Sequence, residues 1–382
     1  VASRKRKHGP KFRQGQKSVQ EIQESAFSGC TSLLTVEFET KEGYDQALKT
    51  IGLKAFQNCE ALQSIAIPAN VTSIGNYAFS NCYNLSQITL NAKLSTIGTY
   101  MFQNAGKNAE SLSVTIPEGI KTIGDYMFNY CSKLEHFDYK LSDEASPARS
   151  GDNSTWQTSG MYNLTSAYHM FAGTKITSFY RDLPGLTMGS WMFADVNTLV
   201  NVDTYDEESG EESGEEMEIL KGKSGYDALE DGSHMFDSTS IVSFYRDLPA
   251  LTNGDSMFLS TKLKVFANGD VNKLTNASYM FRGCGELTTF YSSMSSLELH
   301  GDMFESCNNL GQFYCNLSSL ISGERMFMNF SKLTTFYSDL SSLTNSTSMF
   351  EECAVLANFD AKLDKVLTAD RMFYNCSALT GF

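Results

Sequence analysis

The pair Met-Phe recurs at a fixed interval in the second half of the chain, at Met257, Met280, Met303, Met326, Met349 and Met372. Each return comes 23 residues after the previous one. The unit that starts at Met280 reads MFRGCGELTTFYSSMSSLELHGD, and the next three keep its Phe, a Leu six residues later and a Phe three beyond. A unit this short cannot bury so many apolar side chains alone, so each must stack on its neighbours. The sequence therefore predicts a repeat solenoid.

Alignment of all the repeats identifies one anchor phenylalanine in each, and most anchors are 22 or 23 residues apart. They predict a stack of about 14 turns, with anchors at Phe27, Phe56, Phe79, Phe102, Phe128, Phe171, Phe193, Phe236, Phe258, Phe281, Phe304, Phe327, Phe350 and Phe373. The segment LTTFYS from Leu287 alternates apolar and exposed residue types, which indicates a short strand. We therefore expect a parallel β-sheet on one face of the stack, and turns or short helices on the other.

The domain organisation predicted from these repeats is a basic flexible arm at residues 1–18 and one solenoid at residues 19–382. Turns of an Ala-Phe type fill 19–126, and turns of a Met-Phe type fill 127–382. Insertions near 142–160 and 206–225 belong to a duplicated block of 65 residues, because FYRDLPGLTMGSWMF from Phe179 returns as FYRDLPALTNGDSMF from Phe244. The second insertion is acidic but lacks the spacing of a calcium loop, so we predict solvated loops and no metal site.

Charge is distributed unevenly along the chain. The formal net charge is −14, and removing the seven positive charges of the arm (Arg4, Lys5, Arg6, Lys7, Lys11, Arg13 and Lys17) leaves −21 for the rest. An acidic body repels nucleic acid, whereas the arm could contact an acidic partner.

No apolar run approaches the roughly 20 residues that cross a bilayer, so we predict no membrane span. The arm also lacks the apolar segment of a secretory signal peptide.

Eight of the nine cysteines occupy one repeat position, three residues after the anchor: Cys30, Cys59, Cys82, Cys131, Cys284, Cys307, Cys353 and Cys376. Other turns hold Ala105, Val196 or Phe330 there, which leaves no disulfide partner unpaired. We therefore predict a ladder of buried, reduced thiols that behave as small hydrophobic side chains. Cys315 is out of this register, and we expect it to point inward from a strand.

The amino-terminal turns carry a more specific pattern, I-G-x-x-A-F-x-x-C-x-x-L-x-x-I-x-I-P, which is clearest in IGLKAFQNCEALQSIAIP from Ile51. This pattern resembles the BspA-type leucine-rich repeats of bacterial surface proteins. From Met127 onward, the Met-Phe-x-x-Cys-x-x-Leu form resembles a sister repeat of the same group. The resemblance implies a leucine-rich-repeat-like right-handed stack with a strand at Leu-x-x-Ile-x-Ile. It also implies attachment to host matrix and cells.

Catalytic chemistry is not indicated by the sequence. The five histidines (His8, His136, His169, His234 and His300) form no recognisable site. There is no phosphate loop, no His-Glu-x-x-His and no Gly-x-Ser-x-Gly elbow. His169 and His234 hold the same repeat offset, but duplication alone explains that match. We predict a protein that is not an enzyme and has no cofactor.

The better functional candidate is a column of tyrosines that should face outward from successive strands: Tyr180, Tyr245, Tyr291, Tyr314 and Tyr337, edged by Arg181 and Arg246. Exposed tyrosine offers rigid apolar area and a hydroxyl at low entropic cost, which suits a protein or glycan ligand. The same tyrosines could instead stabilise the sheet by pairing along neighbouring strands. Both interpretations remain open at this stage.

The function predicted first is a recognition or adhesion module that binds a protein or glycan through a concave, tyrosine-rich sheet. The alternatives are a structural attachment protein of a virion or appendage, anchored by the basic arm, and an intracellular scaffold whose arm binds nucleic acid. We expect an extracellular, cell-surface or virion location. Because the chain stops on a strand, we also expect association through its uncapped end at Phe382.

Overall fold

The computed structural model describes most of the repeat region, namely residues 11–12, 19–38, 48–91, 93–115, 123–135, 164–177, 179, 183–200, 202, 225–267, 271–298 and 301–381. The remainder of the predicted arm and nearly all of both insertions lie outside the described residues. The chain falls into two compact units, Val1–Arg181 and Asp182–Phe382. Each unit is a parallel β-solenoid, which confirms the predicted fold class.

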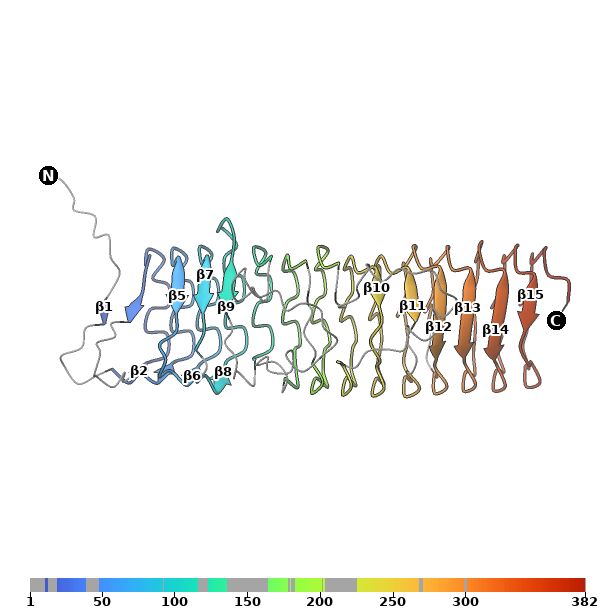
Figure 1. Ribbon diagram of the computed structural model, residues 1–382, viewed down its shortest axis with the longest axis horizontal. Helices are drawn as coiled ribbons and strands as arrows, with labels where there is room; N and C mark the ends of the chain where they lie inside the picture. Colours follow the sequence, from blue (N-terminus) through green and yellow to red (C-terminus); the bar gives the residue numbers. More distant parts are fainter. Residues whose placement is uncertain are drawn as a thin grey trace, which may run out of the picture. The chain divides into compact units, whose positions relative to one another are not determined.

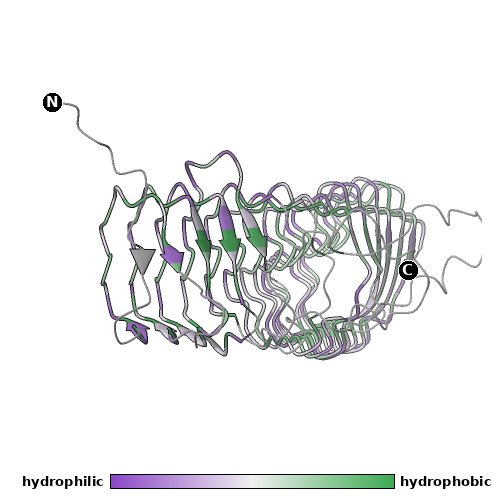
Figure 2. Cartoon of the chain, turned by 60° about the vertical axis from the view of Figure 1, so that its left-hand side comes forward, coloured by the Kyte–Doolittle hydropathy of each residue, from purple (hydrophilic) through white to green (hydrophobic). Residues whose placement is uncertain are grey.

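The amino-terminal unit carries short parallel strands in three sheets (Figure 1). One sheet pairs β1 (Lys11–Phe12) with β3 (Glu37–Phe38). A second has β2 (Glu21–Ile22), β4 (Thr50–Ile51), β6 (Ser73–Ile74) and β8 (Thr96–Ile97), and a third has β5 (Ser64–Ala66), β7 (Gln87–Thr89) and β9 (Ser113–Thr115). In β5 and β7 a buried isoleucine lies between two less buried polar or small residues, and Figure 2 shows both hydrophobic and hydrophilic residues on the strands of this unit. Since β1 lies inside the predicted arm, strand pairing begins before residue 19.

The carboxy-terminal unit carries one sheet of parallel strands in chain order (Figure 1). They are β10 (Ser243–Phe244), β11 (Val265–Ala267), β12 (Thr289–Ser293), β13 (Gln312–Asn316), β14 (Thr335–Asp339) and β15 (Asn358–Asp360). At the repeat positions that form β4, β6 and β8 in the first unit, the described residues of this unit pair only through isolated bridges, such as Asp231 to Asn253 and Asn253 to Asn276.

The number of turns that carry a strand after the anchor is smaller than predicted. Ten strands (β3, β5, β7, β9 and β10 to β15) occupy that position, against about 14 anchors. After Phe128, Phe171 and Phe193 the position lies partly or wholly outside the described residues, and after Phe373 the described backbone forms no strand. Within the described ranges no helix occurs, and every anchor lies in a turn.

The anchors form the core of each unit. Their rings stack with centroids 5.0–5.9 Å apart from Phe27 to Phe171, and 5.3–5.7 Å apart from Phe193 to Phe373. Almost all of these rings are fully buried. Burying an aromatic side chain contributes roughly 2–3 kcal/mol, so the ladder is the main apolar contribution of each turn.

Every anchor is flanked by two residues of positive φ, one two positions before it and one two positions after it. Examples are Lys54 (φ 56°) and Asn58 (φ 59°) around Phe56. In this turn the amides of Lys54, Phe56 and Asn58 point along the stack and donate to carbonyls of the next turn at 2.8–2.9 Å. A left-handed residue other than glycine costs roughly 1–2 kcal/mol, and the inter-turn hydrogen bonds offset that cost.

The cysteine ladder is present, but its thiols are not merely small hydrophobic groups. All nine cysteines are free, and only the end-turn members Cys30 and Cys376 are exposed or half-buried. In seven turns the Sγ donates to the carbonyl of the preceding anchor at 2.9–3.3 Å, as Cys307 does to Phe281. Burial raises the pKa of Cys59, Cys131 and Cys353 to about 12. The protonated thiol is therefore a hydrogen-bond donor between turns.

Candidate functional site

The exposed tyrosine column lies on the sheet of the carboxy-terminal unit. Parallel register pairs Tyr291 of β12 with Tyr314 of β13, and Tyr314 with Tyr337 of β14. Their side chains are 47%, 36% and 44% exposed, whereas the phenylalanine that precedes each of them is buried. The period-two alternation of a strand explains this division, because successive side chains point to opposite faces. We call these three residues the tyrosine face.

The rings of the tyrosine face are only partly stacked. The ring planes of Tyr314 and Tyr337 are nearly parallel, with an interplanar angle of 7° and centroids 5.9 Å apart. Tyr291 and Tyr314 are tilted by 49°, with centroids 6.4 Å apart. The column of tyrosines ends on both sides at a different residue type, since register places buried Ala267 beside Tyr291 and exposed Asp360 beside Tyr337.

The remaining predicted site residues are Tyr180, Tyr245, Arg181 and Arg246. Tyr180 and Arg181 lie outside the described residues. Tyr245 is half-buried. Arg246 was expected to edge the face, but it is only 3% exposed, because its Nε donates to the carbonyl of Val202 at 3.3 Å and its guanidinium lies 5.3 Å from the ring centroid of Tyr226. Arg246 therefore stabilises the interior of its unit.

Sequence reasoning missed a second aromatic ladder, in the amino-terminal unit. It occupies the left-handed position two residues before the anchor, where Tyr77, Tyr100, Tyr126 and His169 stack with centroids 4.7, 4.2 and 4.8 Å apart. Burial, together with hydrogen bonds to Tyr168 and Tyr100, raises the pKa of Tyr126 well above its ordinary value. The recurring aromatic residue two positions before the anchor was the signal that could have revealed it.

The two histidines with matching offsets lie in separate units, and each stacks on an aromatic ring. His169 lies on Tyr126, and His234 lies 3.8 Å from Trp191 while its Nδ1 contacts the Asp237 carboxylate at 2.9 Å. His8, His136 and His300 lie outside the described residues. Within the part of the chain that the structure describes, no group of three or more His, Cys, Asp or Glu residues converges as a metal site would.

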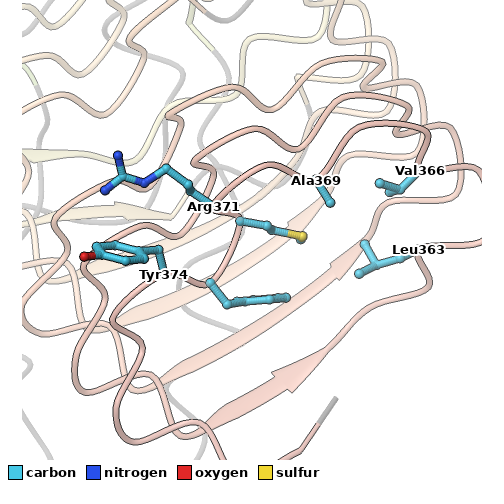
Figure 3. A pocket seen from close by; sticks show the side chains of 7 residues that line it. Leu363, Val366, Ala369, Arg371 and Tyr374 are labelled. Carbon is cyan, nitrogen blue, oxygen red and sulfur yellow. The ribbon is translucent and has the colours of Figure 1, made fainter.

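An open apolar hollow of about 550 Å³ lies at the last described turns (Figure 3). Its lining is Leu363, Val366, Ala369, Arg371, Met372, Phe373 and Tyr374. The guanidinium of Arg371 lies 4.3 Å from the ring centroid of Tyr374 and contacts the Glu351 carboxylate at 2.6 Å. The expected association through Phe382 cannot be placed on this surface, because Phe382 is outside the described residues.

The stacked turns, the parallel sheets and the anchor ladder define a leucine-rich-repeat solenoid. The family model for the BspA type leucine rich repeat region matches in six copies, over residues 13–135 and 252–380. The chain belongs to the BspA-type leucine-rich-repeat family. No curated protein matches it in sequence.

A solved structure supports this fold. A leucine-rich repeat protein from Bacteroides ovatus is 22% identical, with a TM-score of 0.62 over 94% of this chain and 81% of that one. A leucine rich cell surface protein from Faecalibacterium prausnitzii is 18% identical, with a TM-score of 0.33 over 90% of this chain and 77% of that one. A search of the described residues finds no helix long and apolar enough to span a membrane.

Proposed function

We propose that this chain is a non-enzymatic binding module whose tyrosine face engages a protein or glycan partner. The observation that carries the proposal is that three consecutive tyrosines, in strand register, leave 36–47% of their side-chain surface exposed. Contiguous exposed aromatic area is uncommon on soluble proteins and is typical of recognition surfaces. Family membership supports the same class of protein.

The competing explanation is that these tyrosines only stabilise the sheet, and a comparison within the chain weighs against it. Where aromatic rings stack tightly, as Tyr77, Tyr100 and Tyr126 do, their centroids are 4.2–4.7 Å apart and their planes lie within 11°. The tyrosine face has wider separations of 5.9–6.4 Å and one tilt of 49°. The wider separation and the tilt leave more ring surface for a ligand than the closer parallel stacking does.

The proposal is tested by measuring how the wild-type chain and a variant without the three tyrosines bind to arrays of matrix proteins and glycans. We expect the triple change Tyr291→Ser, Tyr314→Ser and Tyr337→Ser to abolish binding while the far-UV circular dichroism and urea midpoint stay close to wild type. The matched control changes Tyr130, Tyr279 and Tyr374 to Ser, since these side chains are 54%, 37% and 47% exposed but lie in turns. Binding that survives in the folded triple variant excludes the tyrosine face.

We further place this module at the cell surface or outside the cell, the location that its resemblance to BspA-type surface proteins favours. Antibody labelling of intact cells of the source organism is the test. Label that appears only after the cells are permeabilised contradicts this location.

A further inference from the structure

Charge on the strands β10 to β15, which carry the tyrosine face, has one sign. The described strands β10 to β15 contain no Lys, Arg or His, and their charged residues are Asp339 and Asp360. Asp360 continues the tyrosine column, because register places it beside Tyr337. Asp339 lies two residues beyond Tyr337 in β14, so its side chain points to the same face. Both are exposed, and both lie at the carboxy-terminal end of the face.

The carboxylate of Asp339 is held in its ionised form. Ser341 donates to it through its hydroxyl and through its backbone amide, the latter at 2.9 Å, and this lowers the pKa of Asp339. Exposed Lys362, just beyond β15, adds a weaker effect in the same direction. The rest of the face is neutral and polar, with Thr289, Gln312, Asn316, Thr335 and Asn358 on the same side of their strands. The strands themselves therefore offer an anionic ligand two carboxylates and no cation, and exposed Lys362 beyond β15 offsets only one of these two charges.

The spacing of the tyrosines matches an extended polypeptide. Ring centroids are 6.4 and 5.9 Å apart along the column. In an extended segment, alternate side chains lie on one face and repeat at about 6.7 Å. A segment that runs along the column, across the strands, thus places every second side chain beside a tyrosine. Cationic side chains are attracted to the faces of such rings and to nearby carboxylates.

We propose that the partner of the tyrosine face is an extended protein segment with Lys or Arg at alternate positions. This inference rests on the proposed function. The cations lie beside Tyr291, Tyr314 and Tyr337, and the last of them pairs with Asp339 and Asp360. The negative charge of the whole chain, −14, speeds the approach of such a segment.

The test measures fluorescence anisotropy of three labelled peptides with the full chain. One peptide alternates Arg and Ser, one has the same composition with its Arg residues contiguous, and one alternates Glu and Ser. We expect the alternating Arg peptide to bind best, and the Glu peptide not to bind. Because two exposed ion pairs are removed, Asp339→Asn with Asp360→Asn should weaken binding of the Arg peptide about tenfold.

The matched control is Glu298→Gln with Asp364→Asn, which removes the same charge at exposed positions outside the strands. Equal weakening by the two double variants overturns the inference, because it assigns the binding to net charge alone. A neutral glucose oligosaccharide that binds in a tyrosine-dependent way, while the Arg peptide does not, overturns this inference and leaves the proposed function standing. If no ligand depends on the three tyrosines, both fail.

Discussion

The two units build the same turn around different side chains. In the amino-terminal unit the inward strand position holds Ile65, Ile88 and Val114, and the anchor ladder is the continuous aromatic stack of the core. In the carboxy-terminal unit that position holds phenylalanine from Phe244 to Phe359, which forms a second ladder with centroids 5.3–6.4 Å apart. These rings also meet the anchors edge-on at 4.8–5.6 Å. Aromatic side chains in the carboxy-terminal unit thus occupy the inward strand position that Ile and Val occupy in the amino-terminal unit.

A second difference lies four residues before the anchor. In the amino-terminal unit a Cβ at Gly75 would lie 2.5 Å from the backbone nitrogen of Leu53, so the turns approach closely there and pair as β4, β6 and β8. In the carboxy-terminal unit a Cβ at Gly254 would meet the Met280 sulfur at 3.1 Å. A methionine side chain can shift to make room for a Cβ, whereas backbone cannot. This explains why Ala277 and Ser346 occur four residues before the anchor in the carboxy-terminal unit.

The comparison shows how one backbone supports two kinds of aromatic surface. The ladder from Tyr77 to His169 in the first unit stacks tightly on the turns, whereas the tyrosine face of the second unit lies on the strands with wider spacing and stays exposed. The ladder stabilises turns that contain left-handed residues, and the exposed tyrosine face is the surface that we propose binds a ligand. Four measurements sharpen this contrast.

The largest effect is expected on the two faces of β13. Phe313→Ala removes a ring that is 1% exposed and contacts neighbouring rings on both ladders, and it should cost about 4 kcal/mol of unfolding free energy. Tyr314→Ala, on the opposite face of the same strand, should cost about 0.5 kcal/mol. Urea unfolding followed by circular dichroism gives both values. Equal costs would contradict the assignment of the core to the phenylalanine side.

The second-largest effect on stability is expected at the glycine four residues before the anchor. Gly75→Ala should destabilise by about 3 kcal/mol, because the new methyl group meets backbone, whereas Gly254→Ala should cost about 1 kcal/mol or less. Native-state hydrogen exchange distinguishes a local effect in β4 and β6 from a global one. If the two variants are equally destabilised, close approach of the backbone is not what requires glycine in the first unit.

The thiol ladder is a feature that the two units share, so Cys131→Ala and Cys353→Ala should behave alike. Each should cost about 1–2 kcal/mol at neutral pH, from lost packing and a lost inter-turn hydrogen bond. Since the folded pKa of Cys131 is raised from 9.0 to about 12, its contribution is complete below pH 9 and is lost as the pH rises toward 12. The cost of Cys131→Ala should therefore shrink above pH 9 by about 1.4 kcal/mol per pH unit and change sign at about pH 10, above which the variant is more stable than the wild type.

The control for this pH effect is Cys30→Ala, since Cys30 is exposed. Chemical denaturation at several pH values measures all three variants. A pH-independent cost for Cys131→Ala would show that the buried thiol titrates alike in the folded and unfolded chains.

The smallest effects concern the left-handed positions. Tyr100→Gly relieves a φ of 56° but removes stacking on both sides, and it should destabilise by about 1 kcal/mol. Arg325→Gly relieves a φ of 59° at an exposed side chain and should stabilise by about 0.5 kcal/mol. Thermal unfolding resolves the opposite signs. Destabilisation of both variants would mean that the backbone is not strained at these positions.

The fold could be predicted from the sequence because the same pattern of buried and exposed residues recurs in many repeats. The spacing of the Met-Phe pairs, the cysteine register and the alternation in LTTFYS each recur, so chance patterns average out. The register of Tyr291, Tyr314 and Tyr337 followed in the same way. The burial of Arg246 could not be predicted in this way, because it depends on Val202 and Tyr226, which lie outside its own turn.

The sequence by itself determined the period, the inward and outward alternation and the position of the thiols, since all of these are properties of a single repeat. Only the tertiary structure decided what happens between turns. It set the hydrogen bond from each buried thiol to the preceding anchor, the stack from Tyr77 to His169 and the spacing of the tyrosine face. Contacts between turns depend on distances of a few ångströms along the stack, and residue type specifies those distances only after the backbones have packed.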